Sequence, residues 1–325
     1  MRNLFKLPVA FLPLILLSHL CVPRVIGAVD GFSLRPVSVV RQPGSAGAGN
    51  VGQSSSISVG IVEFKTLDSK ILSQPVNFAV YLPPSYAESK TSYPAIVFLH
   101  GLFENEKRWA ERGGKDVLDS LIAEKKVGEV VVAIPDVGRS FYTNSYDGGK
   151  KYEDFVVQEF IPYVGASYRV KQGPKWLALS GSSMGGYGAL KIGMKHSQMF
   201  NSVSAHSAVL VPKFPENIEP GSRSARYLQI LEGPFGKPFH REYWESENPI
   251  HLAEHPEKFK GLRLSFDCGD HDRYGFDEGA RGLDRVLTEK GFPHEFAILP
   301  GDHGWEYLKQ HMHRSLEFHW KNFGK

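Results

Sequence analysis

The chain has 325 residues, of which 38 are basic and 35 acidic, and it contains two cysteines. The small basic excess is not clustered, which argues against the charge pattern of a nucleic-acid-binding protein. One cysteine, Cys21, lies in the apolar N-terminal segment, so Cys268 is the only cysteine of the remaining chain. A disulfide framework and a cysteine-based zinc site are therefore excluded.

The first 28 residues have the pattern of a secretory signal peptide. Arg2 and Lys6 precede an apolar run over 7–22, and small residues follow up to Ala28. The run is shorter than the about 20 apolar residues of a membrane-spanning helix, and it contains two prolines. We expect a secreted or periplasmic protein, cleaved after Gly27 or Ala28, with no stable membrane association afterwards.

Residues 29–56 are predicted to form a flexible leader or linker, because 41–56 are rich in glycine and serine and lack apolar periodicity. Three basic residues and no acidic residue lie within 1–28, so the rest of the chain carries 35 of each. The basic character of the chain thus belongs to the export signal.

From residue 57 to residue 325, predicted strands and helices alternate. Strands are indicated by alternating or continuous apolar residues at 56–64, 76–84, 94–101, 129–136, 175–181, 200–207, 261–269 and 294–301. Helices are indicated at 115–126, 152–168, 184–196, 277–291 and 304–320. This alternation predicts one α/β domain with a mostly parallel central sheet and helices on both faces.

The segment 207–248 interrupts the alternation. It is rich in proline, glycine and aromatic residues and has no clean period. Long insertions in α/β enzymes are often binding loops or lids. We expect either such a lid or binding insertion, or a structural excursion that covers one face of the sheet.

A nucleophile is predicted at Ser183. The stretch Gly181-Ser182-Ser183-Met184-Gly185 fits G-x-S-x-G, follows an apolar strand and precedes a helix. This pattern forms a sharp strand-to-helix turn that exposes the central serine above the sheet. The helix N-terminus behind it favours a developing anion. Ser182 is expected to point away from the site.

A serine nucleophile needs a base and an orienting carboxylate, which on this type of fold follow in the order serine, acid, histidine. His303 directly follows the predicted strand 294–301, at the sheet edge where open α/β sheets bind ligands. It is the expected base. The acid is one of Asp267, Asp270 and Asp272, and spacing alone leaves this choice open.

Two other histidines and a candidate metal-binding turn lie near the predicted triad in the sequence. His206 comes too early for the expected order, and His271 shares a turn with the candidate acids, so structural roles are expected for both. The turn 270–275 also resembles the start of a calcium-binding EF-hand loop. Tyr274 and Arg281 stand where such a loop needs oxygen ligands, so no metal site is expected.

Two backbone N–H groups are expected to form an oxyanion hole. One belongs to Met184, the residue after the nucleophile, and the other to Leu102, in the loop after the early strand. His100 precedes this loop and is expected to be a structural turn residue.

Several motifs resemble those of one enzyme family in the family's own order: "VYLPPSY", "YPAIVFLHG", "GSSMGGYGAL", "DCGDHD" and "LPGDHGWEYL". The chain resembles the esterase D-like branch of the α/β-hydrolases, which includes feruloyl and acetyl xylan esterases, S-formylglutathione hydrolases and mycolyl transferases. The resemblance implies the α/β-hydrolase fold and a triad of Ser183, Asp272 and His303. It also implies Leu102 and Met184 as oxyanion donors.

The expected function is that of a secreted carboxylic-ester hydrolase that works through an acyl-enzyme and needs no cofactor. Feruloyl or acetyl esters of carbohydrates are the expected substrates, and the sequence indicates no oligomeric state. An acyltransferase that delivers the acyl group to a sugar, and an inactive carbohydrate-binding module, are alternatives. Aromatic residues expected to line an aromatic or sugar pocket are Trp109, Phe141, Tyr142, Trp244 and Trp305.

Overall fold

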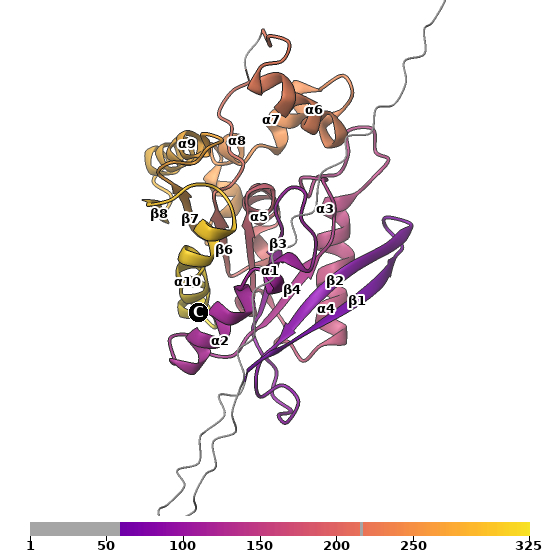
Figure 1. The fold of residues 1–325 in the computed structure, drawn as a ribbon, viewed down its shortest axis with the longest axis vertical. Coiled ribbons are helices and arrows are strands. Elements are labelled where there is room, and N and C mark those ends of the chain that lie inside the picture. Colours follow the sequence, from indigo (N-terminus) through magenta and orange to yellow (C-terminus); the bar gives the residue numbers. More distant parts are fainter. Residues whose placement is uncertain (1–58, 215–216) are drawn as a thin grey trace, which may run out of the picture. The chain divides into compact units, whose positions relative to one another are not determined.

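The structure is a computed structural model that describes residues 59–214 and 217–325 (Figure 1). The described residues all belong to one unit of the chain, Ser55–Lys325. The predicted signal peptide over 1–28 and the predicted linker over 29–56 lie outside the described residues. Both therefore stay predictions.

Within the described residues, eight strands form one sheet in the order β1-β2-β4-β3-β5-β6-β7-β8. The strands are β1 (Ile61–Ser69), β2 (Gln74–Leu82), β3 (Ala95–Leu99), β4 (Val131–Pro135), β5 (Leu177–Ser182), β6 (Ser202–His206), β7 (Arg263–Gly269) and β8 (His294–Leu299). β1 pairs antiparallel with β2, and β2 pairs antiparallel with β4. All other strand pairs of the sheet are parallel. The predicted mostly parallel sheet is confirmed.

The bounds of the first strand differ from the prediction. β1 runs past the predicted end at residue 64 to Ser69, because its pairing with β2 continues from Ile61–Leu82 to Ser69–Gln74. The turn at 70–73 then closes this hairpin. The length and register of a hairpin strand depend on its partner strand and on the turn. The apolar pattern of the first strand alone therefore does not predict where that strand ends.

Helices cover both faces of the sheet, as predicted (Figure 1). One apolar cluster joins the strands to α1 (Arg108–Glu111), α2 (Gly114–Ala123) and α10 (Trp305–Asn322). The other joins them to α3 (Tyr152–Asp154), a π-helical turn (Phe155–Phe160), α4 (Ile161–Ser167), α5 (Met184–Lys195) and α9 (Phe276–Glu289). Short 3₁₀ turns lie at Pro174–Trp176, Ser197–Met199 and Pro256–Phe259.

The segment 207–248 contains helices that the sequence pattern did not predict. They are α6 (Arg223–Phe235) and α7 (Arg241–Glu247), and α8 (Pro249–Leu252) follows. A side chain that accepts a backbone N–H group begins each of the three. Ser222 Oγ accepts from Ala225 at 3.1 Å, His240 Nδ1 from Tyr243 at 3.2 Å, and Asn248 Oδ1 from Ile250 at 3.1 Å. Figure 1 shows α6 and α7 side by side at one end of the domain.

A buried ion cluster connects α3, α5 and α7. The fully buried ammonium of Lys191 lies 2.6 Å from a Glu153 oxygen and 3.1 Å from a Glu247 oxygen, and Lys195 lies 2.6 Å from the other Glu247 oxygen. Burial alone would raise the pKa of Glu153. The charges of Lys191 and Lys195 and a hydrogen bond from His196 outweigh burial, so the pKa of Glu153 is well below its ordinary value.

We predict that Glu153→Gln lowers the free energy of unfolding at pH 7 by about 3–5 kcal/mol, because the two lysines of the cluster, Lys191 and Lys195, are then left to share the single carboxylate of Glu247. A carboxyl whose pKa is lowered by folding stabilises the native state above its unfolded pKa, and this contribution is lost as the pH falls below about 4.3. Urea unfolding between pH 7 and pH 3.5 measures both effects. The variant should be less stable at pH 7 and lose less stability on acidification.

The exposed Glu289, changed to glutamine, is the matched control and should behave like the wild type. A Glu153→Gln variant that keeps the wild-type stability and pH profile would show that the cluster does not stabilise the fold.

Candidate active site

Ser183 occupies a strained turn between β5 and α5. Its φ of 57° and ψ of −118° place a non-glycine residue where few side chains are found. The Ser183 N–H donates to the carbonyl of His206 at 2.9 Å, and the Ser183 carbonyl accepts from Val209 N–H at 3.1 Å. These two bonds hold the turn from both sides.

The glycines of the G-x-S-x-G motif are required by close backbone contacts. A Cβ on Gly181 would lie 2.2 Å from the carbonyl oxygen of Gly185, and a Cβ on Gly185 would lie 1.8 Å from that of Leu99. Both distances are far inside van der Waals contact. The tight crossing of β5, α5 and β3 therefore needs glycine at both positions.

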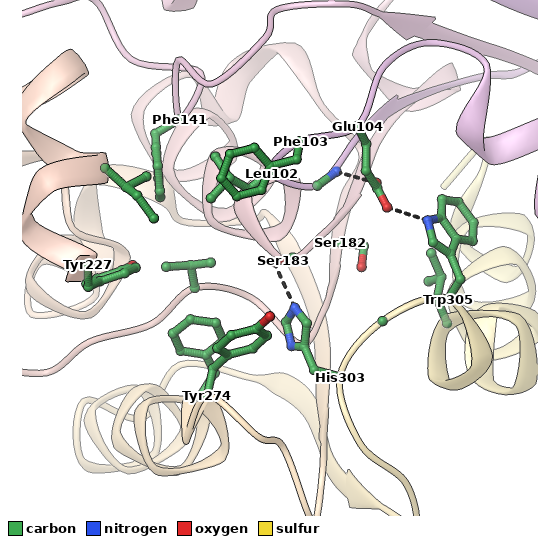
Figure 2. Close-up of a pocket in the computed structure, with 16 residues that line it drawn as sticks. Leu102, Phe103, Glu104, Phe141, Ser182, Ser183, Tyr227, Tyr274, His303 and Trp305 are labelled. Carbon is green, nitrogen blue, oxygen red and sulfur yellow. Dashed lines mark hydrogen bonds between the residues drawn. The ribbon is translucent and has the colours of Figure 1, made fainter. Parts of the chain in front are cut away.

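Ser183, His303 and Asp272 form a hydrogen-bonded chain. His303 Nε2 lies 2.9 Å from Ser183 Oγ (Figure 2), and His303 Nδ1 lies 2.7 Å from Asp272 Oδ2. Since Nδ1 faces a carboxylate, it is the donor, which leaves Nε2 free to accept the serine proton. Asp272 follows β7 and His303 follows β8, so parallel strands deliver both residues to one edge of the sheet.

The Asp272 carboxylate is held in its ionised form. Burial alone would raise its pKa, but the hydrogen bond and charge of His303 and the N–H of Tyr274 outweigh burial. The pKa of Asp272 is therefore below its ordinary value. Cys268 Sγ also lies 3.4 Å from Asp272 Oδ2. An ionised carboxylate at this position can orient the His303 ring and stabilise its protonated form.

The other candidate acids and bases have different partners. Asp267 accepts from Tyr307 at 2.6 Å and lies 3.0 Å from the buried His206 ring. Asp270 pairs with His271, whose side chain is 83% exposed. The structure thus places Asp272, and neither of the other two aspartates, beside His303.

The expected oxyanion donors lie at the nucleophile. Met184 is the first residue of α5, so its N–H has no acceptor within the helix. Leu102 lies in the loop after β3, and this loop is next to the nucleophile, since a Cβ on Gly101 would lie 3.6 Å from Ser183 Cβ. His100 Nδ1 donates to the Gly101 carbonyl at 2.8 Å and its Nε2 accepts from Val137 N–H, which is a structural role.

A pocket of about 210 Å³ opens above Ser183 and His303 (Figure 2). Its lining combines the two catalytic candidates with a mainly apolar wall. The apolar and aromatic lining residues are Leu102, Phe103, Phe141, Val209, Tyr227, Ile230, Tyr274, Phe276, Trp305 and Leu308. Three of them come from the segment 207–248, which therefore supplies part of the binding wall.

Of the five aromatic residues expected to line a pocket, Phe141 and Trp305 lie in its wall and the other three do not. Trp109 is buried and packs edge-on against Tyr81. Tyr142 is buried and donates to the His100 carbonyl. Trp244 is buried and packs edge-on against the ring of Phe214. These three residues belong to the core, where large aromatic side chains bury the most apolar area.

Sequence reasoning missed most of the pocket wall. Tyr274 and Phe276 follow Asp272 within four positions, so proximity to the acid was an available signal. Tyr227 and Ile230 lie in α6, where they recur with Leu231 and Phe235 at helical spacing, so a short amphipathic pattern was also an available signal.

The described ranges contain no cluster of three histidine, cysteine or acidic side chains that could hold a metal ion. In the same ranges, every helix is too short or too polar to cross a membrane.

The sheet order, the serine turn and the loops that carry Asp272 and His303 define an α/β-hydrolase fold. A family model described as putative esterase matches residues 69–319, and the chain belongs to this family. Esterase Rv1288 of Mycobacterium tuberculosis is 28% identical over 252 residues, which cover 69% of this chain and 51% of that protein. The chain thus spans about half the length of the curated relatives it matches.

Solved structures agree with this assignment. A ferulic acid esterase is 30% identical, with a TM-score of 0.69, and the match covers 82% of this chain and 99% of that one. An S-formylglutathione hydrolase from Agrobacterium tumefaciens has a TM-score of 0.64 at 22% identity, covering 84% and 99%. MPT51 of Mycobacterium tuberculosis has a TM-score of 0.61 at 18% identity, covering 81% and 99%. The resemblance to the esterase D-like branch is confirmed.

We predict that Gly185→Ala abolishes ester turnover and lowers the melting temperature, because its Cβ would collide with the Leu99 carbonyl. Gly233→Ala in α6 is the matched control, since no heavy atom lies within 4 Å of its added Cβ. This control should keep activity and a melting temperature close to that of the wild type. Thermal unfolding and turnover of p-nitrophenyl acetate test both variants. Wild-type behaviour of Gly185→Ala would refute the packing argument.

Proposed function

We propose that the protein is a serine esterase that hydrolyses carboxylic esters through an acyl-enzyme on Ser183. The observation that carries this proposal is the hydrogen-bonded chain from Ser183 through His303 to Asp272 at the base of a pocket. The membership of the chain in the esterase family also supports ester hydrolysis.

In the acylation step, Ser183 Oγ attacks the ester carbonyl carbon while His303 Nε2 accepts the hydroxyl proton. The N–H groups of Leu102 and Met184 stabilise the negative carbonyl oxygen, and losing one such donor costs about 3 kcal/mol. The intermediate collapses when His303 returns the proton to the departing alcohol. Asp272 holds the imidazole and stabilises its charge throughout, and general base action contributes about 10²–10⁴-fold.

In the deacylation step, water takes the place of the alcohol. His303 accepts a proton from the water as it attacks the acyl carbon, and then returns the proton to Ser183 Oγ. The carboxylic acid leaves, and the triad is restored. Every proton transfer uses the same nitrogen, so the single Nε2–Oγ contact of 2.9 Å serves both steps.

We propose that the acyl group is aromatic, of the feruloyl kind, and is carried by a carbohydrate alcohol. The pocket beside Ser183 is walled by Phe141, Val209, Tyr227 and Phe276, which would contact the faces and edges of an aryl ring. An acetyl group would leave most of this wall uncovered. The similarity to a ferulic acid esterase at 30% identity supports this choice over acetyl esters.

We propose that the protein is secreted or periplasmic, because residues 1–28 have the pattern of a signal peptide. Plant-type polysaccharide esters are accessible at such a location. The proposed substrate is thus a carbohydrate ester outside the cytoplasm.

Methyl ferulate and methyl acetate test the acyl preference because they share one leaving group. Burial of an aryl ring contributes about 1.5–3 kcal/mol, so kcat/KM should be about 10–150-fold higher for the ferulate. Ser183→Ala should remove turnover of both esters. Asp272→Asn should lower kcat by about 10⁴-fold, because the amide favours the wrong tautomer of His303.

The matched control is Asp270→Asn in the same turn, whose amide oxygen can still accept the Gly301 N–H. It should keep wild-type turnover. Activity that survives in Ser183→Ala would exclude the triad mechanism. Equal kcat/KM for the two esters would retain the mechanism and exclude the aromatic acyl preference.

A further inference from the structure

One side chain connects the two loops that carry the catalytic groups. Glu104, in the loop after β3, accepts the Gly101 N–H on Oε2 at 2.9 Å. Its other oxygen, Oε1, accepts the indole N–H of Trp305. Figure 2 shows the Glu104 carboxylate between its own loop and the Trp305 ring. The oxyanion loop is thus tied to the first residue of α10, two positions after His303.

The first of these hydrogen bonds acts on the backbone of the oxyanion hole. Gly101 directly precedes Leu102, so fixing the Gly101 N–H restrains the chain that orients the Leu102 N–H. An oxyanion donor must lie about 2.7–3.1 Å from the charged oxygen. A misplacement of about 1 Å at such a group can cost about 10²-fold in rate.

The second hydrogen bond acts on the histidine loop. Gly304, between His303 and Trp305, has a φ of 116°, a conformation that favours glycine and gives the loop no side-chain packing. The indole N–H of Trp305 bonds to Glu104 beyond this glycine. Glu104 therefore supplies a restraint on the loop from outside it.

Charge argues against a direct chemical role for Glu104. Among the described residues that line the pocket, Glu104 is the only one with an acidic side chain. A carboxylate close to a developing oxyanion opposes that charge. Both of its oxygens already accept N–H groups, and His303 already holds the base position.

We propose that Glu104 is a positioning residue that holds the oxyanion loop against the histidine loop through Gly101 and Trp305. This role rests on the proposed function, because it acts only through the Leu102 N–H and the His303 imidazole.

The test is a double-mutant cycle of Glu104→Ala and Trp305→Phe on the full chain, with methyl ferulate as substrate. Trp305→Phe keeps an aromatic ring in the pocket wall and removes the N–H donor together with the second ring of the indole. Glu104→Ala should lower kcat by about 10–100-fold and change KM by less than about twofold, since a displaced donor weakens the transition state more than substrate binding. Trp305→Phe should have a smaller effect of the same kind.

The double variant should be no slower than Glu104→Ala, because both changes remove one shared contact. Glu104→Gln keeps one acceptor oxygen and should recover part of the lost kcat. Glu111→Ala, which removes an exposed carboxylate on α1, should match the wild type. Melting temperatures close to that of the wild type would separate the effect on kcat from loss of the fold.

Unchanged or higher kcat in Glu104→Ala overturns the proposal, and so does a double variant whose loss is the product of the two single losses. Failure of the proposed function has a different signature, which is turnover that persists in Ser183→Ala.

Discussion

The turn at Ser183 is the constraint on which the site depends. Its positive φ persists because the surrounding backbone determines it from several sides, through the bonds to His206 and Val209 and the contact of Gly185 with Leu99. The same crossing brings β3, β5 and β6 together at one point. Ser183, the N–H of Met184 and the start of the segment 207–248 therefore lie side by side.

The strands of the sheet position the triad residues, and the insertion forms part of the pocket wall. Parallel strands deliver Ser183, Asp272 and His303 to one edge, which explains why the hydrogen-bonded chain needs no residue from the insertion. The insertion contributes Val209, Tyr227 and Ile230 to the pocket wall, and the other apolar and aromatic wall residues come from outside it.

Features that depend on neighbouring residues could be predicted from the sequence, and features that depend on tertiary packing could not. The strand-to-helix turn at Ser183 depends on neighbouring glycines, so its position could be predicted from a few residues. The assignment of Asp272 needed the family resemblance, because three aspartates lie within six residues at the end of β7. Trp109 and Tyr227 illustrate the limit: both are aromatic in sequence, and only tertiary packing sends one to the core and the other to the pocket.

In the proposed mechanism, Ser183 carries a covalent acyl group during turnover. The most direct measurement is the intact mass of the enzyme, followed by peptide mapping, after rapid mixing with p-nitrophenyl ferulate and quenching in acid. We expect a mass increase of one feruloyl group, located on the peptide that contains Ser183 and missing in Ser183→Ala. Product release without any adduct in samples quenched during a burst, or an adduct on another residue, would contradict it.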